Sequence, residues 1–186
     1  MDDKVIDQSA LALGQRIEAG ACDPRDLVDQ LLHAIPVADP DHAIYSRLCP
    51  DRARAEAEAA YDRAKRGLRR SVLDGVPISW KDLFDTAGIE TSGGSALLTG
   101  RVPMRDAAIL DRLKSAGTIC IGKTNMTELA FSGLGINPVT GTPANPYDLK
   151  IKRAPGGSTS GGAVSLARGL AAVSYTHLTL PTILRV

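Results

Sequence analysis

Val76-Pro-Ile-Ser-Trp80 is a short apolar run that leads directly to Lys81. The run is too brief and too rich in β-branched side chains for a helix, so it predicts a strand. The turn signal Asp74-Gly75 stands just before it and marks where the strand begins. We therefore expect Lys81 to lie at the end of a buried strand.

A helix and a second strand are expected further along the chain. Asp106 is the predicted N-cap of a helix through Ala116, and Gly117 ends that helix. Thr118-Ile-Cys-Ile121 then has the composition of a buried strand. Because a helix between two buried strands is typical of layered folds, the sequence predicts the α/β class.

Three helices are expected before the first strand. Residues 8–20 and 23–35 carry apolar residues at helical spacing, and the second run has Asp23 as N-cap and Pro24 at the first helical position. Residues 50–69 are rich in Ala, Glu, Arg and Lys. Since the apolar stripe of this run is mostly alanine, it predicts a longer and more exposed helix on the outside.

The composition argues against several classes of protein. Of the 186 residues, 44% are hydrophobic, and 22 basic against 21 acidic residues give a formal net charge of +1. This balance indicates neither disorder nor a nucleic-acid partner. The wide separation of Cys22, Cys49 and Cys120 favours a reducing compartment. With acidic residues at its start and no apolar run of membrane-spanning length, we expect a cytoplasmic protein with no membrane partner.

Gly156-Gly-Ser-Thr-Ser-Gly-Gly162 ends a long segment, residues 132–157, that is rich in Gly, Pro and Asn. Its composition alone is typical of a flexible linker. The residues that follow it, 163–172, are mostly small and apolar, as in a helix packed closely on a sheet. We therefore expect the glycines to let backbone and hydroxyl groups crowd a small site at the start of that helix.

Gly117-Thr-Ile-Cys-Ile-Gly-Lys-Thr124 matches the P-loop pattern G-x-x-x-x-G-K-[ST]. In a P-loop the strand precedes the first glycine, and the residues between the glycines surround the phosphates. Here the intervening residues are Thr, Ile, Cys and Ile, which belong in a strand. Nucleotide binding is therefore a distant alternative.

Lys81 and the three histidines limit which side chains could serve as a catalytic base. A lysine beside Trp80 at a strand end is either an ordinary surface residue or, if desolvated, a base whose pKa is lowered from about 10.4. His33, His42 and His177 are scattered along the chain, so neither a metal site nor a Ser-His-Asp triad is indicated. A hydrolase would need a base other than histidine.

Four segments together resemble the amidase-signature family. Gly75-Val-Pro-Ile-Ser-Trp-Lys-Asp-Leu-Phe-Asp85 is similar to the lysine segment of that family, and Gly122-Lys-Thr-Asn-Met-Thr-Glu128 is similar to its G-K-T-N-M-x-E segment. Asn145-Pro146 and Pro155-Gly-Gly-Ser-Thr-Ser-Gly-Gly162 follow in the family's order and approximate spacing. The resemblance implies a mixed sheet covered by helices. It also implies hydrolysis of a small-molecule carboxylic amide with no metal and no organic cofactor.

The resemblance also implies roles for individual residues. The family uses a Ser, cis-Ser, Lys triad, in which the lysine takes a proton from the nucleophilic serine through the bridging cis-serine. Matched residue by residue, Lys81 is the base, and Ser158 is the bridging serine after a cis peptide bond from Gly157. Ser132 aligns with a position near the acyl pocket and is a candidate substrate-binding residue.

The chain departs from the family after residue 172. The family continues into a strand and a Gly-x-Asp-x-Gly-Gly-Ser turn, which supplies the nucleophile and the N–H groups of the oxyanion hole. Residues 173–186 contain no glycine and no acidic residue. We interpret residues 1–172 as the N-terminal part of an amidase-signature domain and residues 173–186 as a non-native tail from a frameshift or adapter. We expect a truncated amidase, inactive as it stands. The alternative is a noncatalytic remnant that binds an amide-like ligand or a partner chain.

Overall fold

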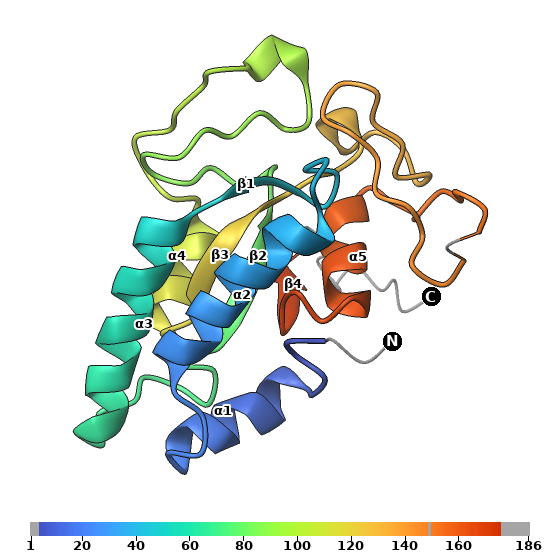
Figure 1. Ribbon diagram of the computed structural model, residues 1–186. Helices are drawn as coiled ribbons and strands as arrows, with labels where there is room; N and C mark the ends of the chain where they lie inside the picture. The colour runs from blue at the N-terminus through green and yellow to red at the C-terminus, as the bar shows by residue number, and fades with distance from the viewer. Residues whose placement is uncertain (1–3, 149, 176–186) are drawn as a thin grey trace, which may run out of the picture.

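The computed structural model describes residues 4–148 and 150–175 (Figure 1). Within these residues four strands form one mixed sheet in the order β1-β3-β2-β4. β1 (Tyr45–Leu48) is antiparallel to β3 (Ile119–Thr124), whereas β2 (Pro77–Lys81) is parallel to both β3 and β4 (Val173–Tyr175). The α/β class predicted from the sequence is confirmed.

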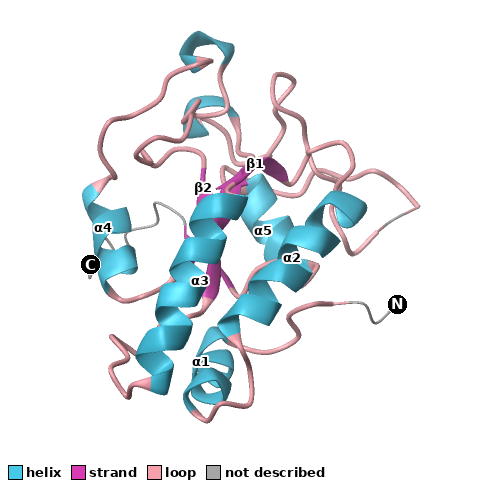
Figure 2. Ribbon diagram, turned by 60° about the vertical axis from the view of Figure 1, so that its left-hand side comes forward, coloured by secondary structure: helices cyan, strands magenta, loops and turns pink. Residues whose placement is uncertain are grey.

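Helices cover both faces of this sheet (Figures 1 and 2). α3 packs on β3 with α2 beside it, while α5 packs on β2 and β4. Arg52 of α3 lies 4.6 Å from the ring of Trp80, and Ser165 of α5 lies 3.3 Å from the hydroxyl of Ser79. Since successive strand residues point to opposite faces, α3 and α5 lie on opposite sides of β2. The helices span α1 (Ala10–Glu18), α2 (Pro24–Ala38), α3 (Pro50–Lys65), α4 (Ala108–Ser115) and α5 (Ser160–Ala167), with short 3-10 turns at Ala96–Leu98 and Glu128–Ala130.

The sequence signals for α2 and α3 act locally as expected, with one difference in length. Asp23 caps α2 by accepting a hydrogen bond from the backbone N–H of Arg25. In α3 the alanine stripe at Ala53, Ala57 and Ala60 is fully buried, and small side chains let the helix approach the sheet closely. The helix ends at Lys65 rather than at residue 69.

Asp106 does not cap α4 as predicted. The N-cap is Ala107, which makes no side-chain cap hydrogen bond. The carboxylate of Asp106 instead accepts a hydrogen bond from the backbone N–H of Ala87 at 2.7 Å and forms an ion pair with Arg52 at 3.3 Å. The loop before α4 is thereby attached to α3, a long-range contact that local sequence does not reveal.

β4 begins where the non-native tail was expected to begin. Val173 pairs with Ile78, and Ser174 pairs with Ser79, so these residues continue the sheet. Residues 176–186, with His177, lie outside the described residues. The division of the chain at residue 172 stays a prediction. In the part of the chain that the structure describes, no helix has the length and apolarity needed to cross a membrane.

Candidate functional site

β2 carries Lys81 to the sheet end beside α5. All five residues of this strand are buried, and the side chain of Lys81 has no exposed surface. Ser79 already faces α5 through its contact with Ser165, and alternation along the strand directs Lys81 to that same face. The strand therefore delivers an amine into the interior, where burial disfavours its charged form.

The glycine loop carries Ser158 to the same place. The peptide bond between Gly157 and Ser158 is cis, as the family resemblance implies. The backbone carbonyl of Ser158 accepts a hydrogen bond from the N–H of Thr127 at 3.0 Å. A Cβ on Gly157 would lie 2.6 Å from the backbone nitrogen of Gly135 and 2.7 Å from Oγ1 of Thr127. The loop is thus packed against neighbouring chain and is not a free linker.

Lys81 and Ser158 meet through their side chains. Nζ of Lys81 donates a hydrogen bond to Oγ of Ser158 at 2.8 Å, which confirms the contact expected from the sequence. Burial lowers the pKa of Lys81 to about 8. An amine with this pKa is still mostly protonated near neutral pH, but its neutral fraction is far larger than that of an exposed lysine, and the neutral form can accept a proton from the hydroxyl that it contacts.

Ser132 borders the same open cavity as Ser158. The cavity has a volume of about 770 Å³, and its lining also includes Phe131, whose side chain is 93% exposed. Oγ of Ser132 accepts a hydrogen bond from the backbone N–H of Leu134. The backbone carbonyl of Ser132 accepts a hydrogen bond from the hydroxyl of Thr127. The structure therefore brings the three sequence-derived candidates, Lys81, Ser158 and Ser132, to one site.

Sequence reasoning missed several residues that build this site. Backbone N–H groups of Gly156 and Gly157 donate to the carbonyls of Leu134 and Gly133, at 3.2 and 2.8 Å. Thr127 binds both Ser132 and Ser158, as described above, and it stands inside the G-K-T-N-M-T-E segment. The position of Thr127 in that segment was the sequence signal that could have identified it. A residue that closely follows a strand end is held near the site by that strand.

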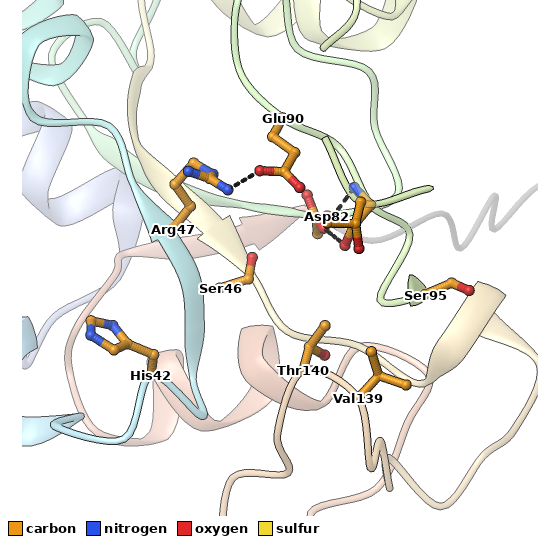
Figure 3. A pocket seen from close by; sticks show the side chains of 10 residues that line it. His42, Ser46, Arg47, Asp82, Glu90, Ser95, Val139 and Thr140 are labelled. Atoms are coloured by element: carbon orange, nitrogen blue, oxygen red, sulfur yellow. Dashed lines mark hydrogen bonds and ion pairs between the residues drawn. The ribbon is translucent and has the colours of Figure 1, made fainter. Parts of the chain in front are cut away.

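A second, polar cavity is lined in part by Asp82, the residue after Lys81 in the sequence, and by Ser46 of β1 (Figure 3). Its volume is about 270 Å³, and Arg47 and Glu90 form an ion pair at its edge. Asp82 accepts two hydrogen bonds from Ser92. Among the described residues, no group of three or more His, Cys, Asp or Glu side chains has a metal-binding arrangement.

Comparisons with known proteins find similarity to amidases and to an amidotransferase subunit. A family model described as Amidase matches residues 26–176 and so extends past residue 172. A glutamyl-tRNA(Gln) amidotransferase subunit from Anaeromyxobacter dehalogenans (strain 2CP-C) is 44% identical over 156 residues, which cover 84% of this chain and 31% of that protein.

Solved structures show the same relationship. The native peptide amidase of Stenotrophomonas maltophilia has a TM-score of 0.81 at 34% identity, covering 90% of this chain and 35% of its own. A chain from a vestigial protein complex, described as revealing the evolutionary origins of an s-triazine catabolic enzyme, has a TM-score of 0.83 at 32% identity, with 90% and 36% covered. The chain spans about a third of the length of the relatives it matches.

Proposed function

Since this chain belongs to the amidase family, we propose that it is the part of an amidohydrolase that carries the base and the bridging serine of a Ser/cis-Ser/Lys triad. The observation that supports the proposal most directly is the 2.8 Å hydrogen bond between Lys81 and Ser158. The lysine is fully buried there, and its pKa is lowered to about 8. A surface lysine would have neither property.

The proposed relay passes a proton toward Lys81 when the nucleophile attacks and returns a proton to the leaving amine afterwards. Neutral Lys81 accepts the proton of the Ser158 hydroxyl, while Ser158 accepts the proton of a nucleophilic serine that attacks the amide carbonyl. When the tetrahedral intermediate collapses, the same path returns the proton to the leaving amine. Water then hydrolyses the acyl-enzyme by the reverse sequence of transfers. The nucleophile is the group that this proposal leaves to a longer chain.

Ser174 and Thr182 are not our candidates for that nucleophile. Oγ of Ser174 is buried, and a Cβ on Gly162 would lie 2.2 Å from it, so this hydroxyl is packed against α5. Thr182 lies outside the described residues. We propose that the 186 residues alone do not hydrolyse amides, and that the substrate of the parent enzyme is a small-molecule carboxylic amide bound beside Ser132 and Ser158.

The test joins residues 1–172 to the continuation of the Anaeromyxobacter relative, which restores a full-length chain. This extended protein is assayed against a panel of simple amides, together with its Lys81→Ala and Ser158→Ala variants. We expect hydrolysis by the extended protein and a loss of roughly 10²–10⁴-fold in each variant, the range for general acid–base groups. Equal activity in all three proteins would rule out the proposed roles, and a folded but inactive extended protein would count against the amidase assignment.

A further inference from the structure

The open cavity beside Ser158 and Ser132 has an uncharged lining. Its volume is about 770 Å³, and the described residues that border it are three glycines, two alanines, a proline, a phenylalanine, two serines and a threonine. None of these side chains carries a charge. A wall of small, apolar and hydroxyl groups fits an uncharged ligand, because a charged group placed against it would lose hydration without gaining a partner.

The charged residues nearest to this lining in the sequence are engaged elsewhere. The carboxylate of Glu128 accepts a hydrogen bond from a serine hydroxyl at 2.7 Å, and Arg153 forms an ion pair with Asp148 at 2.7 Å. Lys81 is fully buried and is not among the residues that border the cavity. These neighbours therefore leave the wall without a countercharge for a charged ligand.

Phe131 is the large apolar side chain of the lining, and it is 93% exposed. Backbone hydrogen bonds anchor the turn that carries it: the N–H of Leu129 donates to the carbonyl of Gly93 at 2.8 Å, and the N–H of Phe131 donates to that of Glu128 at 3.1 Å. Leu129 and Ala130 have positive φ angles of 48° and 59°, which non-glycine residues seldom adopt. An aromatic ring exposed on an anchored turn is a contact surface for the apolar part of a ligand.

We propose that the site takes uncharged amides that carry an aromatic group, and that Phe131 is the specificity-determining residue that this chain contributes. The inference rests on the proposed function, because it assigns a substrate class to the site that Ser158 borders. The hydroxyl of Ser132 accepts a hydrogen bond from Leu134 and keeps its own O–H for donation to a neutral amide. An amide with a carboxylate next to its ring should bind less tightly, since the wall offers that charge no partner.

The test measures binding to the 186-residue chain, labelled with ¹³C in its alanine methyl groups. Ala130 and Ala163 border the cavity, and the variants Ala130→Gly and Ala163→Gly identify their signals. The probes are phenylacetamide, para-carboxyphenylacetamide, which adds one negative charge, and acetamide, which lacks the ring. We expect phenylacetamide to shift both signals, and the other two probes to bind roughly tenfold more weakly.

Three variants assign the selectivity to this wall. Phe131→Ala should weaken the binding of phenylacetamide by roughly 2–12-fold, the range for an aromatic contact. Met104→Ala is the matched control and should leave the affinity unchanged, because Met104 is 91% exposed and does not border the cavity. Ala163 is exposed on α5, so Ala163→Arg adds a cation to the wall. This variant should bind para-carboxyphenylacetamide more tightly, with the signal of Ala130 as the readout.

Several results would overturn the proposal. These are equal affinity for the charged and uncharged probes, an unchanged affinity in Phe131→Ala, an equal loss in Met104→Ala, no gain in Ala163→Arg, or no shift up to the solubility limit of phenylacetamide. Because binding needs no turnover, a chain that binds phenylacetamide while the extended protein fails to hydrolyse amides would contradict the proposed function alone. An extended protein that hydrolyses charged amides as fast as phenylacetamide would contradict the substrate class and leave the relay intact.

Discussion

Lys81 combines full burial with a hydroxyl contact to Ser158. Burial is the cause of its lowered pKa. The pKa of Lys81 therefore depends on the buried position at which β2 ends. This dependence makes its charge state a measure of how well the strand end is formed.

The lowered pKa of Lys81 predicts a specific dependence of stability on pH. Between about pH 8 and pH 10.5, the unfolded chain holds a proton at this amine that the folded chain has released. Stability from this group is therefore fully present above pH 10.5 and is lost as the pH falls through about 8. The expected contribution is at most about 3 kcal/mol.

Urea denaturation of the parent chain and of Lys81→Met, at pH 7 and at pH 10.5, measures this effect. The other titrating groups are common to both proteins and cancel in the difference. We expect the free energy of unfolding of the parent chain to rise relative to the variant as the pH increases. A difference that stays constant over this range would contradict the buried, titrating lysine.

Two serines of the glycine loop are predicted to respond differently to alanine. Ser158 contacts the amine of Lys81, whereas the buried Oγ of Ser160 has no hydrogen-bond partner among the described residues. In the extended protein, Ser158→Ala should lower kcat by roughly 10²–10⁴-fold. Ser160→Ala should have little effect on kcat. Steady-state kinetics with one amide decides, and similar losses in both variants would mean that the loop matters only through its packing.

The elements that meet at the site come from distant parts of the chain. The segment after the 3-10 turn Glu128–Ala130 lies along the glycine loop, and backbone hydrogen bonds connect Gly133 and Leu134 with Gly157 and Gly156. This contact places Ser132 beside Ser158. The long segment of residues 132–157 thus returns to the place where it began and closes one wall of the site.

Gly157 and Gly133 form a matched pair for testing that contact. A Cβ on Gly157 would meet backbone atoms of Gly135 at 2.6–2.7 Å, whereas a Cβ on Gly133 would meet no atom within 4 Å. We predict that Gly157→Ala destabilises the fold by about 1–3 kcal/mol, since overpacking forces the backbone to shift. Gly133→Ala should change stability by less than about 0.5 kcal/mol. Chemical denaturation of both variants measures this, and equal effects would show that the loop is not tightly packed.

At the scale of the whole molecule, one sheet with helices on both faces brings the four family-like segments together. β2 and β3 are parallel neighbours, so Lys81 and Thr124 lie opposite each other at the same sheet end. The glycine loop then starts α5 above that end. The sheet end therefore holds Lys81 and Ser158, the proposed base and bridging serine, in contact. Residues 173–186 contain no glycine, so they do not match the glycine-rich turn that the family resemblance implies.

We accordingly predict that the 186-residue chain shows no amide hydrolysis, while residues 1–172 with the family continuation do. Without a nucleophile, Lys81 and Ser158 have no attacking group to activate, and without the glycine turn the oxyanion has no preorganised donors. Circular dichroism first verifies that both proteins are folded, and the amide panel then compares them. Turnover by the shorter chain that disappears in Ser158→Ala would show that Ser158 is itself the nucleophile.

The sequence by itself determined the local elements and the candidates for the site. The apolar run at residues 76–80, the alanine stripe of α3 and the Asp23 cap act through neighbours in the chain, so periodicity and composition are enough to locate them. Lys81, Ser158 and Ser132 could be named because their motifs occur in a set order. Composition also indicated that the residues between the glycines of the P-loop-like pattern belong in a strand, and β3 contains most of them.

Only the tertiary structure decided how distant residues pair. The ion pair of Asp82 with Lys123 joins the residue after β2 to β3, and the contact of Asp106 with Arg52 replaces the helix cap that local reasoning predicted. The buried setting that lowers the pKa of Lys81 likewise depends on α5 and the glycine loop closing over the sheet end. Hydrogen bonds, ion pairs and desolvation depend on distances through space, and the order of residues along the chain does not specify those distances until the sheet has formed.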